Sequence, residues 1–293
     1  MARENGRTNG TGGKLLSPRS DLIFKKIFGD TDNVDLLRDF LMASLDIPRE
    51  EYDRLEVVDP HLRRAFPEDK LGILDVLLHT KSGMRIDIEI QVSPMKAMPE
   101  RLTYYAARLL ADQMSAGNPY ARVKKVVCIA ILDWELIEDS DRYHNRYRLY
   151  DAGSGSLFTD VLEIHTMELP KLPESGSGEL YYWLKFIGSK RKEEFEMLAT
   201  KSPEIGKAYA VLKRLSADEQ TRLEYEYREK ARLDAIARLE YAQDEARNKG
   251  LAEGKHNAAV EMSRKMLARG MDPEVIADLS GLSLDEVLAL CES

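Results

Sequence analysis

A strictly alternating segment constrains this chain more than any other part of its sequence. Residues 85–92 read RIDIEIQV. Strand side chains alternate between two faces, so the apolar residues share one face and the polar residues share the other. The two sets are Ile86, Ile88, Ile90 and Val92, and Arg85, Asp87, Glu89 and Gln91. The preceding run 73–78 is apolar except for Asp75, and Lys81-Ser82-Gly83 supplies turn residues between the two segments. The pattern predicts a β-hairpin.

The register of this hairpin decides whether two acids meet. A hairpin centred on Ser82 places Asp75 opposite Glu89, with Cβ atoms about 5 Å apart. A register one residue longer pairs Asp75 with Ile90 and puts the acids on opposite faces. In the first register two like charges converge, and a divalent cation between them relieves the repulsion. Magnesium suits such a pair, because it commonly uses only one or two carboxylates together with water and phosphate.

The alternative interpretation is a solvated hairpin face that carries acids by chance. We favour this alternative for Asp87, which belongs to an evenly alternating polar face. Asp75 is different, because it stands alone inside an apolar run, where an unpaired buried carboxylate is costly. The sequence therefore indicates a functional role for Asp75 and for the acid opposite it.

An ordered set of segments resembles a known family. The segments are 20–29 (SDLIFKKIFG), 69–76 (DKLGILDV), 88–91 (IEIQ) and 101–105 (RLTYY). Together they resemble the Rpn family of recombination-promoting nucleases, also described as transposases, in the PD-(D/E)XK nuclease superfamily. The resemblance covers roughly residues 15–175. The sequence departs from the superfamily pattern at Gln91, where a lysine would stand; a glutamine can orient a water molecule but brings no positive charge.

The resemblance implies a magnesium-dependent DNA endonuclease of low sequence specificity that acts in DNA recombination or transposition. Asp75, Glu89 and the backbone carbonyl of Ile90 would hold Mg²⁺ or another divalent cation, and Gln91 would orient the attacking water. Asp21 is a candidate third acid, although it also complements the dipole of its own helix. The residues expected to contact DNA are Lys25, Lys26, Lys70, Arg101 and Tyr104.

Charge keeps a second interpretation open. The chain has 43 basic and 51 acidic residues, which gives a net charge of −8. A surface that is acidic overall does not attract nucleic acid, so any DNA contact has to come from a local basic patch. This charge and Gln91 favour the alternative of a non-catalytic DNA-binding or oligomerising protein on the same fold.

Cysteine and apolar patterns set the expected environment. Cys128 and Cys291 lie far apart, and neither they nor the histidines have disulfide or zinc-site spacing. The segment 1–14 is polar and lacks the apolar core of a signal peptide. No run approaches the roughly 20 apolar residues of a membrane span. We therefore expect a cytoplasmic protein with no membrane contact, and the resemblance implies DNA as its partner.

The order of elements predicts a small mixed α/β sheet flanked by helices and followed by an all-helical C-terminal extension. This order agrees with the α/β fold that the resemblance implies, in which the core is a restriction-endonuclease-like mixed β-sheet. Helices are expected at 21–28, 34–45 and 100–114, and strands at 123–132, at 143–150 and within 157–169. We expect a disordered leader at 1–14, the nuclease-like core at 15–173, packing helices at 179–215, and a helical tail at 216–293. A flexible spacer, ESGSG, occupies 174–178.

The tail combines a long charged helix with a shorter motif. The helix is expected at 217–248, ahead of Gly250 and Gly254, with further helices at 258–268, 272–279 and 283–290. Residues 273–283 resemble the first helix and turn of a helix-turn-helix, but the helix that follows begins Leu-Asp-Glu-Val, and a recognition helix is normally basic or amide-rich. We therefore expect packing or homo-oligomerisation through these helices rather than DNA reading.

Overall fold

The computed structural model describes residues 14–61 and 74–291. These residues fall into two compact units divided between Tyr225 and Glu226. The leader expected at 1–14 lies, except for Lys14, outside the described residues, and so does Lys70. The first unit is a mixed α/β structure and the second is helical, which confirms the predicted order of sheet and helical extension.

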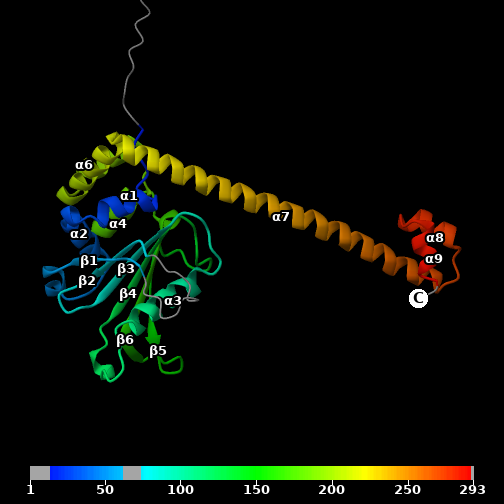
Figure 1. The fold of residues 1–293 in the computed structure, drawn as a ribbon, viewed down its shortest axis with the longest axis horizontal. Coiled ribbons are helices and arrows are strands. Elements are labelled where there is room, and N and C mark those ends of the chain that lie inside the picture. Colours follow the sequence, from blue (N-terminus) through cyan, green and yellow to red (C-terminus); the bar gives the residue numbers. More distant parts are fainter. Residues whose placement is uncertain (1–13, 62–73, 292–293) are drawn as a thin grey trace, which may run out of the picture. The chain divides into compact units, whose positions relative to one another are not determined.

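One six-stranded sheet organises the first unit. Its spatial order is β1-β2-β3-β4-β6-β5, as Figure 1 shows. The central strands β3, β4 and β6 run parallel, and the remaining pairings are antiparallel. The strands are β1 (Glu56–Val58), β2 (Val76–His79), β3 (Arg85–Gln91), β4 (Val126–Leu132), β5 (His144–Tyr150) and β6 (Leu157–Glu168). Every residue of β4 is buried, as its apolar sequence predicts for a strand covered on both faces.

Helices cover both faces of this sheet. The α-helices of the first unit are α1 (Asp21–Phe28), α2 (Val34–Ser44), α3 (Met98–Ala111), α4 (Glu179–Gly188), α5 (Lys192–Ala199) and α6 (Pro203–Ala217). Single 3₁₀ turns are η1 (Thr31–Asn33), η2 (Arg49–Asp53), η3 (Tyr120–Arg122) and η4 (Leu169–Lys171). Helix α3 is the crossover between the parallel strands β3 and β4, so it packs back onto the sheet.

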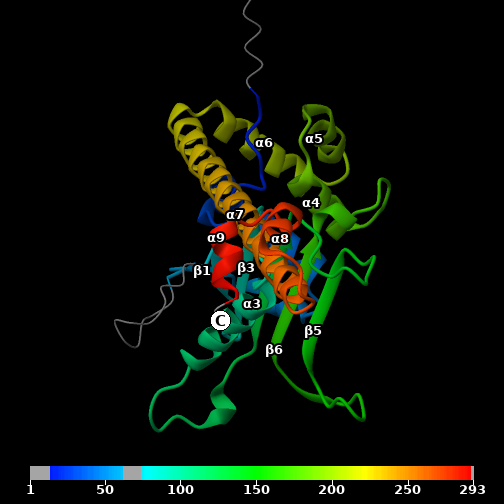
Figure 2. The same ribbon diagram turned by 90° about the vertical axis from the view of Figure 1, so that its right-hand side faces the viewer.

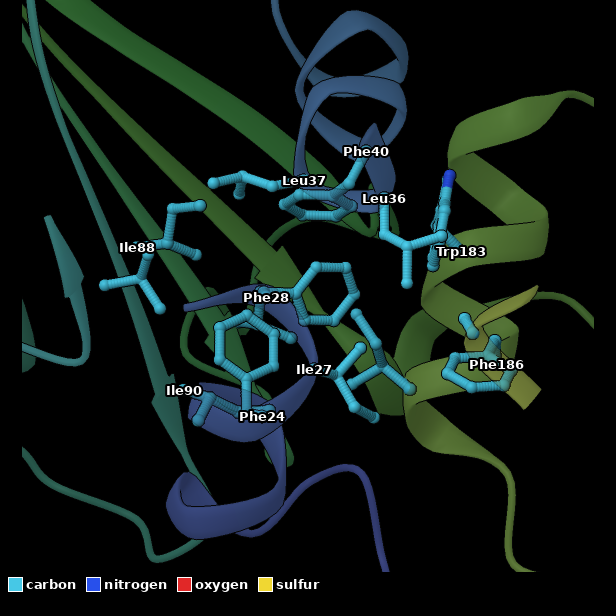
Figure 3. Packing of buried hydrophobic residues seen from close by; sticks show 14 of the residues in the cluster. Phe24, Ile27, Phe28, Leu36, Leu37, Phe40, Ile88, Ile90, Trp183 and Phe186 are labelled. Carbon is cyan, nitrogen blue, oxygen red and sulfur yellow. The ribbon is translucent and has the colours of Figure 1, made fainter. Parts of the chain in front are cut away.

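An aromatic core joins α1, α2 and α4 to the isoleucine face of β3. Figure 3 shows the rings of Phe24 and Phe28 between Ile88 and Ile90 on one side and Trp183 on the other. The Phe28 ring centroid lies 5.5 Å from that of Trp183 and 4.7 Å from that of Phe24. Each such ring that leaves water contributes about 1.5–3 kcal/mol to folding. This packing fixes α1 against β3.

The other face of the sheet lies under α3. Leu102, Ala106 and Leu109 of α3 pack against Cys128 and Ala130 of β4. In the parallel ladder Cys128 pairs with Asp87 and Ala130 pairs with Glu89. The acids of β3 therefore lie on the face that α3 covers, opposite to the isoleucines.

The second unit contains most of one long helix and two short ones. Helix α7 (Glu219–Leu267) starts in the first unit and continues through Gly250 and Gly254, where the sequence predicts a break. Helices α8 (Pro273–Ser280) and α9 (Leu284–Ala289) lie beside its C-terminal end, as Figure 2 shows. Ile276, Leu282 and Val287 form a small core with apolar residues from the end of α7. None of the described helices is both long enough and apolar enough to span a lipid bilayer.

Candidate active site

The hairpin register brings the two acids together. Val76 pairs with Ile88 and Leu77 pairs with Asp87, so the register centred on Ser82 is confirmed. Asp75 immediately precedes β2, and its N–H donates to Oε1 of Glu89 at 3.1 Å. The N–H of Ile90 donates in return to Oδ2 of Asp75 at 2.8 Å. These two hydrogen bonds hold the carboxylates on one side of the hairpin.

A cation from a different helix contacts each acid. Nζ of Lys25, on α1, lies 3.0 Å from Oδ1 of Asp75. Nη2 of Arg101, on α3, lies 3.0 Å from Oε2 of Glu89. Each carboxylate therefore accepts a backbone N–H on one oxygen and binds a cation on the other. The guanidinium of Arg101 also lies over the ring of Tyr105, 5.1 Å from its centroid.

Glu89 is nearly enclosed by protein. Its exposed fraction is 2%. Burial, followed by the negative charge of Asp75, raises its pKa to about 7, although Arg101 acts in the opposite direction. A buried acid with a raised pKa beside a second acid is typical of a functional site rather than of a solvated surface.

The interpretation of Asp87 as part of a solvated hairpin face is wrong. The Asp87 side chain is fully buried beneath α3. Burial, with further contributions from Glu89 and Asp75, raises its pKa well above the usual range. Among the described residues no well-aligned hydrogen-bond donor reaches either of its oxygens. The neighbouring thiol of Cys128, a weak donor, has its own pKa raised by burial and by Asp87. The signal was in the sequence, because β4 reads as a strand covered on both faces.

The remaining candidate residues lie at different places. Asp21 starts α1 one helical turn before Lys25, so the two residues share a face of that helix. Lys26 is near Asp218: hydrogen bonds from Thr221 chiefly lower the pKa of that exposed carboxyl, and the charge of Lys26 adds to this effect. Gln91 ends β3, and its Nε2 donates to the carbonyl of Ser93 at 3.4 Å.

Tyr104 follows Arg101 by three residues on α3, and 38% of its surface is exposed. Its ring centroid lies 6.0 Å from that of Tyr105. Lys70 is outside the described residues. Of the predicted DNA contacts, the structure therefore brings Lys25 and Arg101 directly to the acid pair.

A hollow of about 730 Å³ is lined by apolar residues and by cations that the sequence did not single out. Arg19, Lys185, Lys190 and Arg191 line it together with several acids. Arg19 binds Asp133, whose N–H donates to the carbonyl of Gln91 at 3.0 Å. The hollow therefore begins next to the C-terminal end of β3. These residues come from segments far apart in the sequence, so no local pattern could have identified them.

The acid pair has the chemistry of a site for a hard divalent cation. Both donors are carboxylates, and the positive charges that now lie against them show that the site attracts cations. Within the described part of the chain, no three His, Cys, Asp or Glu side chains are grouped so that they could hold a metal ion. Such an ion would therefore need backbone, water or substrate oxygens in addition to Asp75 and Glu89.

Comparison with known protein families agrees with this geometry. Residues 18–242 match a family described as "PD-(D/E)XK nuclease family transposase". Residues 256–292 match the "Rpn/YhgA-like nuclease family, C-terminal HTH domain". No curated protein and no solved structure matches the chain. The first match covers most of the sequence and confirms the restriction-endonuclease-like fold, and the second confirms the helix-turn-helix resemblance. The chain is thus a member of the PD-(D/E)XK nuclease family of transposases, with the C-terminal domain of the Rpn/YhgA-like nucleases.

Proposed function

We propose that this protein is a metal-dependent DNA endonuclease of low sequence specificity that acts in DNA recombination or transposition. The observation that carries the proposal is the convergence of Asp75 and Glu89, tied by reciprocal backbone hydrogen bonds and flanked by Lys25 and Arg101. Family membership supports the same chemistry. The cation is Mg²⁺ or another hard divalent ion.

Three groups of this chain would hold the cation: the carboxylates of Asp75 and Glu89 and the carbonyl of Ile90. The N–H of Ile90 faces Asp75, and within a strand the N–H and C=O of one residue face the same neighbour. When bound, a divalent cation lowers the pKa of a water molecule and neutralises charge on a phosphate. Asp21 is a further candidate ligand, because it shares a helix face with Lys25.

Basic side chains would bind the DNA backbone on either side of the acids. Arg101 offers a planar fork that suits phosphate, and Lys25 offers a compact charge. Lys26, Lys70 and Tyr104 would extend this contact, together with the cations around Arg19. Because backbone contacts carry no direct sequence information, we expect low selectivity for base sequence.

One observation favours a non-catalytic DNA-binding protein on the same fold as a second candidate. Gln91 would have to orient the attacking water, but its side-chain amide donates to the carbonyl of Ser93. Calorimetric titration with Mg²⁺, run in parallel with a plasmid-nicking assay, separates the two functions. Metal binding together with nicking supports the endonuclease, and metal binding without any hydrolysis supports the second candidate.

The substitution Asp75→Ala tests the endonuclease directly. It removes one of the two carboxylates, so we expect Mg²⁺-dependent nicking of supercoiled plasmid to be abolished. Far-UV circular dichroism should stay unchanged, because Asp75 lies at the edge of the hairpin and not in the apolar core. The matched control is Asp53→Ala, which removes an exposed acid paired with Lys81. The endonuclease proposal is wrong if Asp75→Ala nicks plasmid at the wild-type rate.

A further inference from the structure

We propose that Lys25 and Arg101 occupy the carboxylate oxygens that a divalent cation needs, so that metal and DNA bind this site cooperatively. In the metal-free protein these two side chains act as internal counter-ions of Asp75 and Glu89. DNA phosphates draw them away from the acids and thereby open the site to metal. This inference rests on the proposed function and describes how that same site is regulated.

Each of the four carboxylate oxygens of Asp75 and Glu89 already has a hydrogen-bond or ion-pair partner. Oδ2 of Asp75 and Oε1 of Glu89 accept backbone N–H groups, which the hairpin register fixes. Oδ1 of Asp75 and Oε2 of Glu89 bind Lys25 and Arg101, each at 3.0 Å. A metal ion at either of the second pair of oxygens would lie within a few ångströms of a positive side chain and would be repelled by it. The backbone donors cannot leave without breaking the hairpin, whereas the side chains can rotate away.

Both cations lie nearer to solvent than the acids that they contact. About a third of the Lys25 side chain is exposed, 32%, compared with 13% for Asp75. The Arg101 side chain is 28% exposed, compared with 3% for Glu89. Arg101 also rests over the Tyr105 ring, which supports the guanidinium without help from Glu89. The acids are therefore the fixed partners of these two pairs, and the cations are the mobile ones.

A DNA backbone is the ligand that competes for these cations. Lysine and arginine both bind phosphate through charge-assisted hydrogen bonds, and phosphate oxygens line a duplex at regular spacing. A phosphate that attracts Lys25 leaves Oδ1 of Asp75 open, and one that attracts Arg101 does the same for Oε2 of Glu89. Linkage then requires reciprocity: if DNA raises the affinity for metal, metal raises the affinity for DNA by the same factor.

The test measures Mn²⁺ binding to the full-length protein, using electron paramagnetic resonance of the free ion at mildly alkaline pH. Lys25→Met removes one counter-ion and keeps a long apolar stem, so the Kd for Mn²⁺ should fall about tenfold. Lys25→Arg retains the charge and should bind Mn²⁺ as the wild type does. The matched control is Lys81→Met, which removes a lysine from an exposed pair with Asp53 and should change nothing.

A second measurement adds a phosphorothioate duplex, which resists hydrolysis, to the wild-type protein. The Kd for Mn²⁺ should fall by a comparable factor, and the same duplex should improve the affinity of Lys25→Met less. Thermal unfolding of each variant verifies that it is folded. The comparison of the wild type with and without duplex does not depend on any variant, so it tests the inference even if a variant fails to fold.

The outcomes separate this inference from the proposed function. If the wild type binds Mn²⁺ but Lys25→Met binds it equally or more weakly, internal counter-ions do not control the site. A wild-type Mn²⁺ affinity that is the same with and without the duplex overturns the inference in the same way, while the endonuclease proposal stands. If no form of the protein binds Mn²⁺ with or without DNA, the proposed metal site itself is wrong and the inference is overturned with it.

Discussion

Glu89 has to lose a proton before it can bind a cation. Its pKa of about 7 lies well above the ordinary value of 4.5, chiefly because the side chain is buried and Asp75 is adjacent. Affinity for Mn²⁺ should therefore increase as pH rises through 7, since only the ionised carboxylate is a ligand.

The same shift makes stability depend on pH. Between pH 4.5 and 7 the folded metal-free protein keeps a proton on Glu89 that the unfolded chain has released. The unfolding free energy therefore falls as pH rises through this window, with a contribution on the order of 3 kcal/mol. Denaturant unfolding in the presence of a chelator should show a shallower fall for Glu89→Gln, which has no proton to lose. Equal slopes for the variant and the wild type would contradict the assigned pKa.

Asp75 and Asp87 show what residue patterns reveal and what they leave out. Asp75 could be identified because one acid interrupts an apolar run, but the sequence left two hairpin registers open, and the structure shows the one centred on Ser82 that places Glu89 opposite it. Asp87 was misjudged because alternation shows which residues share a face but not what covers that face. That information lies in the crossover, since α3 has to pack on the polar face of β3 for β4 to be buried. Lys25 contacts Asp75 from a helix 50 residues earlier, so no local pattern predicts this ion pair; the family resemblance implied only that Lys25 contacts DNA.

At the scale of elements, two buried glutamates of the sheet, Glu163 and Glu89, have pKa values that shift in opposite directions. Glu163 on β6 is as buried as Glu89. Burial alone would raise the pKa of Glu163, but hydrogen bonds from His165, Lys125 and Arg148 hold it well below the usual range. This carboxylate of β6 is held by three side chains: His165 of the same strand, Arg148 of β5, and Lys125 immediately before β4. Glu89 has fewer partners and a raised pKa, and this contrast favours a functional role for Glu89 and a structural role for Glu163.

Local sequence patterns predicted most helices and strands, and the length of α7 is the clearest exception. Helices α1 and α2, the hairpin and β4 have strong periodicity and turn residues at their ends. Gly250 and Gly254 predicted a helix break, yet α7 continues through both. Each glycine costs a helix only about 1 kcal/mol. The surrounding sequence, NKGLAEGKHNAA, is otherwise compatible with helix and contains no proline, so the small local cost does not end the helix.

Because both glycines lie inside α7, replacing either with alanine should stabilise the helix. A Cβ atom added at Gly250 or Gly254 meets nothing within 4 Å, so alanine fits at both sites. Gly250→Ala and Gly254→Ala should each stabilise α7 by about 0.5–1 kcal/mol, which hydrogen exchange of the flanking amides would detect. The control is Gly281→Ala, at the C-cap of α8, where φ is +73° and alanine should destabilise. Slower exchange in Gly281→Ala, or faster exchange in Gly250→Ala, would contradict this account.

At the scale of the whole molecule, an acidic protein can still bind DNA if its positive charges are clustered locally. The net charge is −8, but the acid pair has cations from two helices around it, and further cations line the hollow near Arg19. Two acids at the C-terminal helices have local structural roles. Glu286 forms a capping box with Ser283 at the start of α9, and Asp272 caps α8. Neither α8 nor α9 contains a lysine or an arginine, so their sequence does not favour strong phosphate binding.

We therefore predict that destabilising the second unit does not change the rate of DNA cleavage by the first. Every residue proposed to hold metal belongs to the first unit, which has its own apolar core, while Ile276, Leu282 and Val287 form the small core of the second unit. Ile276 is fully buried, so Ile276→Ala should destabilise the second unit by about 2–5 kcal/mol. The Mg²⁺-dependent nicking rate at saturating DNA should stay at the wild-type value, because the acid pair and its cations are unchanged.

Val275→Ala is the matched control for this experiment, because Val275 is the adjacent residue and 48% of its surface is exposed. It should leave both the stability and the nicking rate unchanged. The concentration of DNA at half-maximal rate gives the second readout. An increase for Ile276→Ala alone would mean that the folded helix-turn-helix unit contributes to DNA affinity. A fall in the saturating rate that follows the unfolding of this unit would mean that it takes part in the cleavage step, and the assignment of catalysis to the first unit alone would then be wrong.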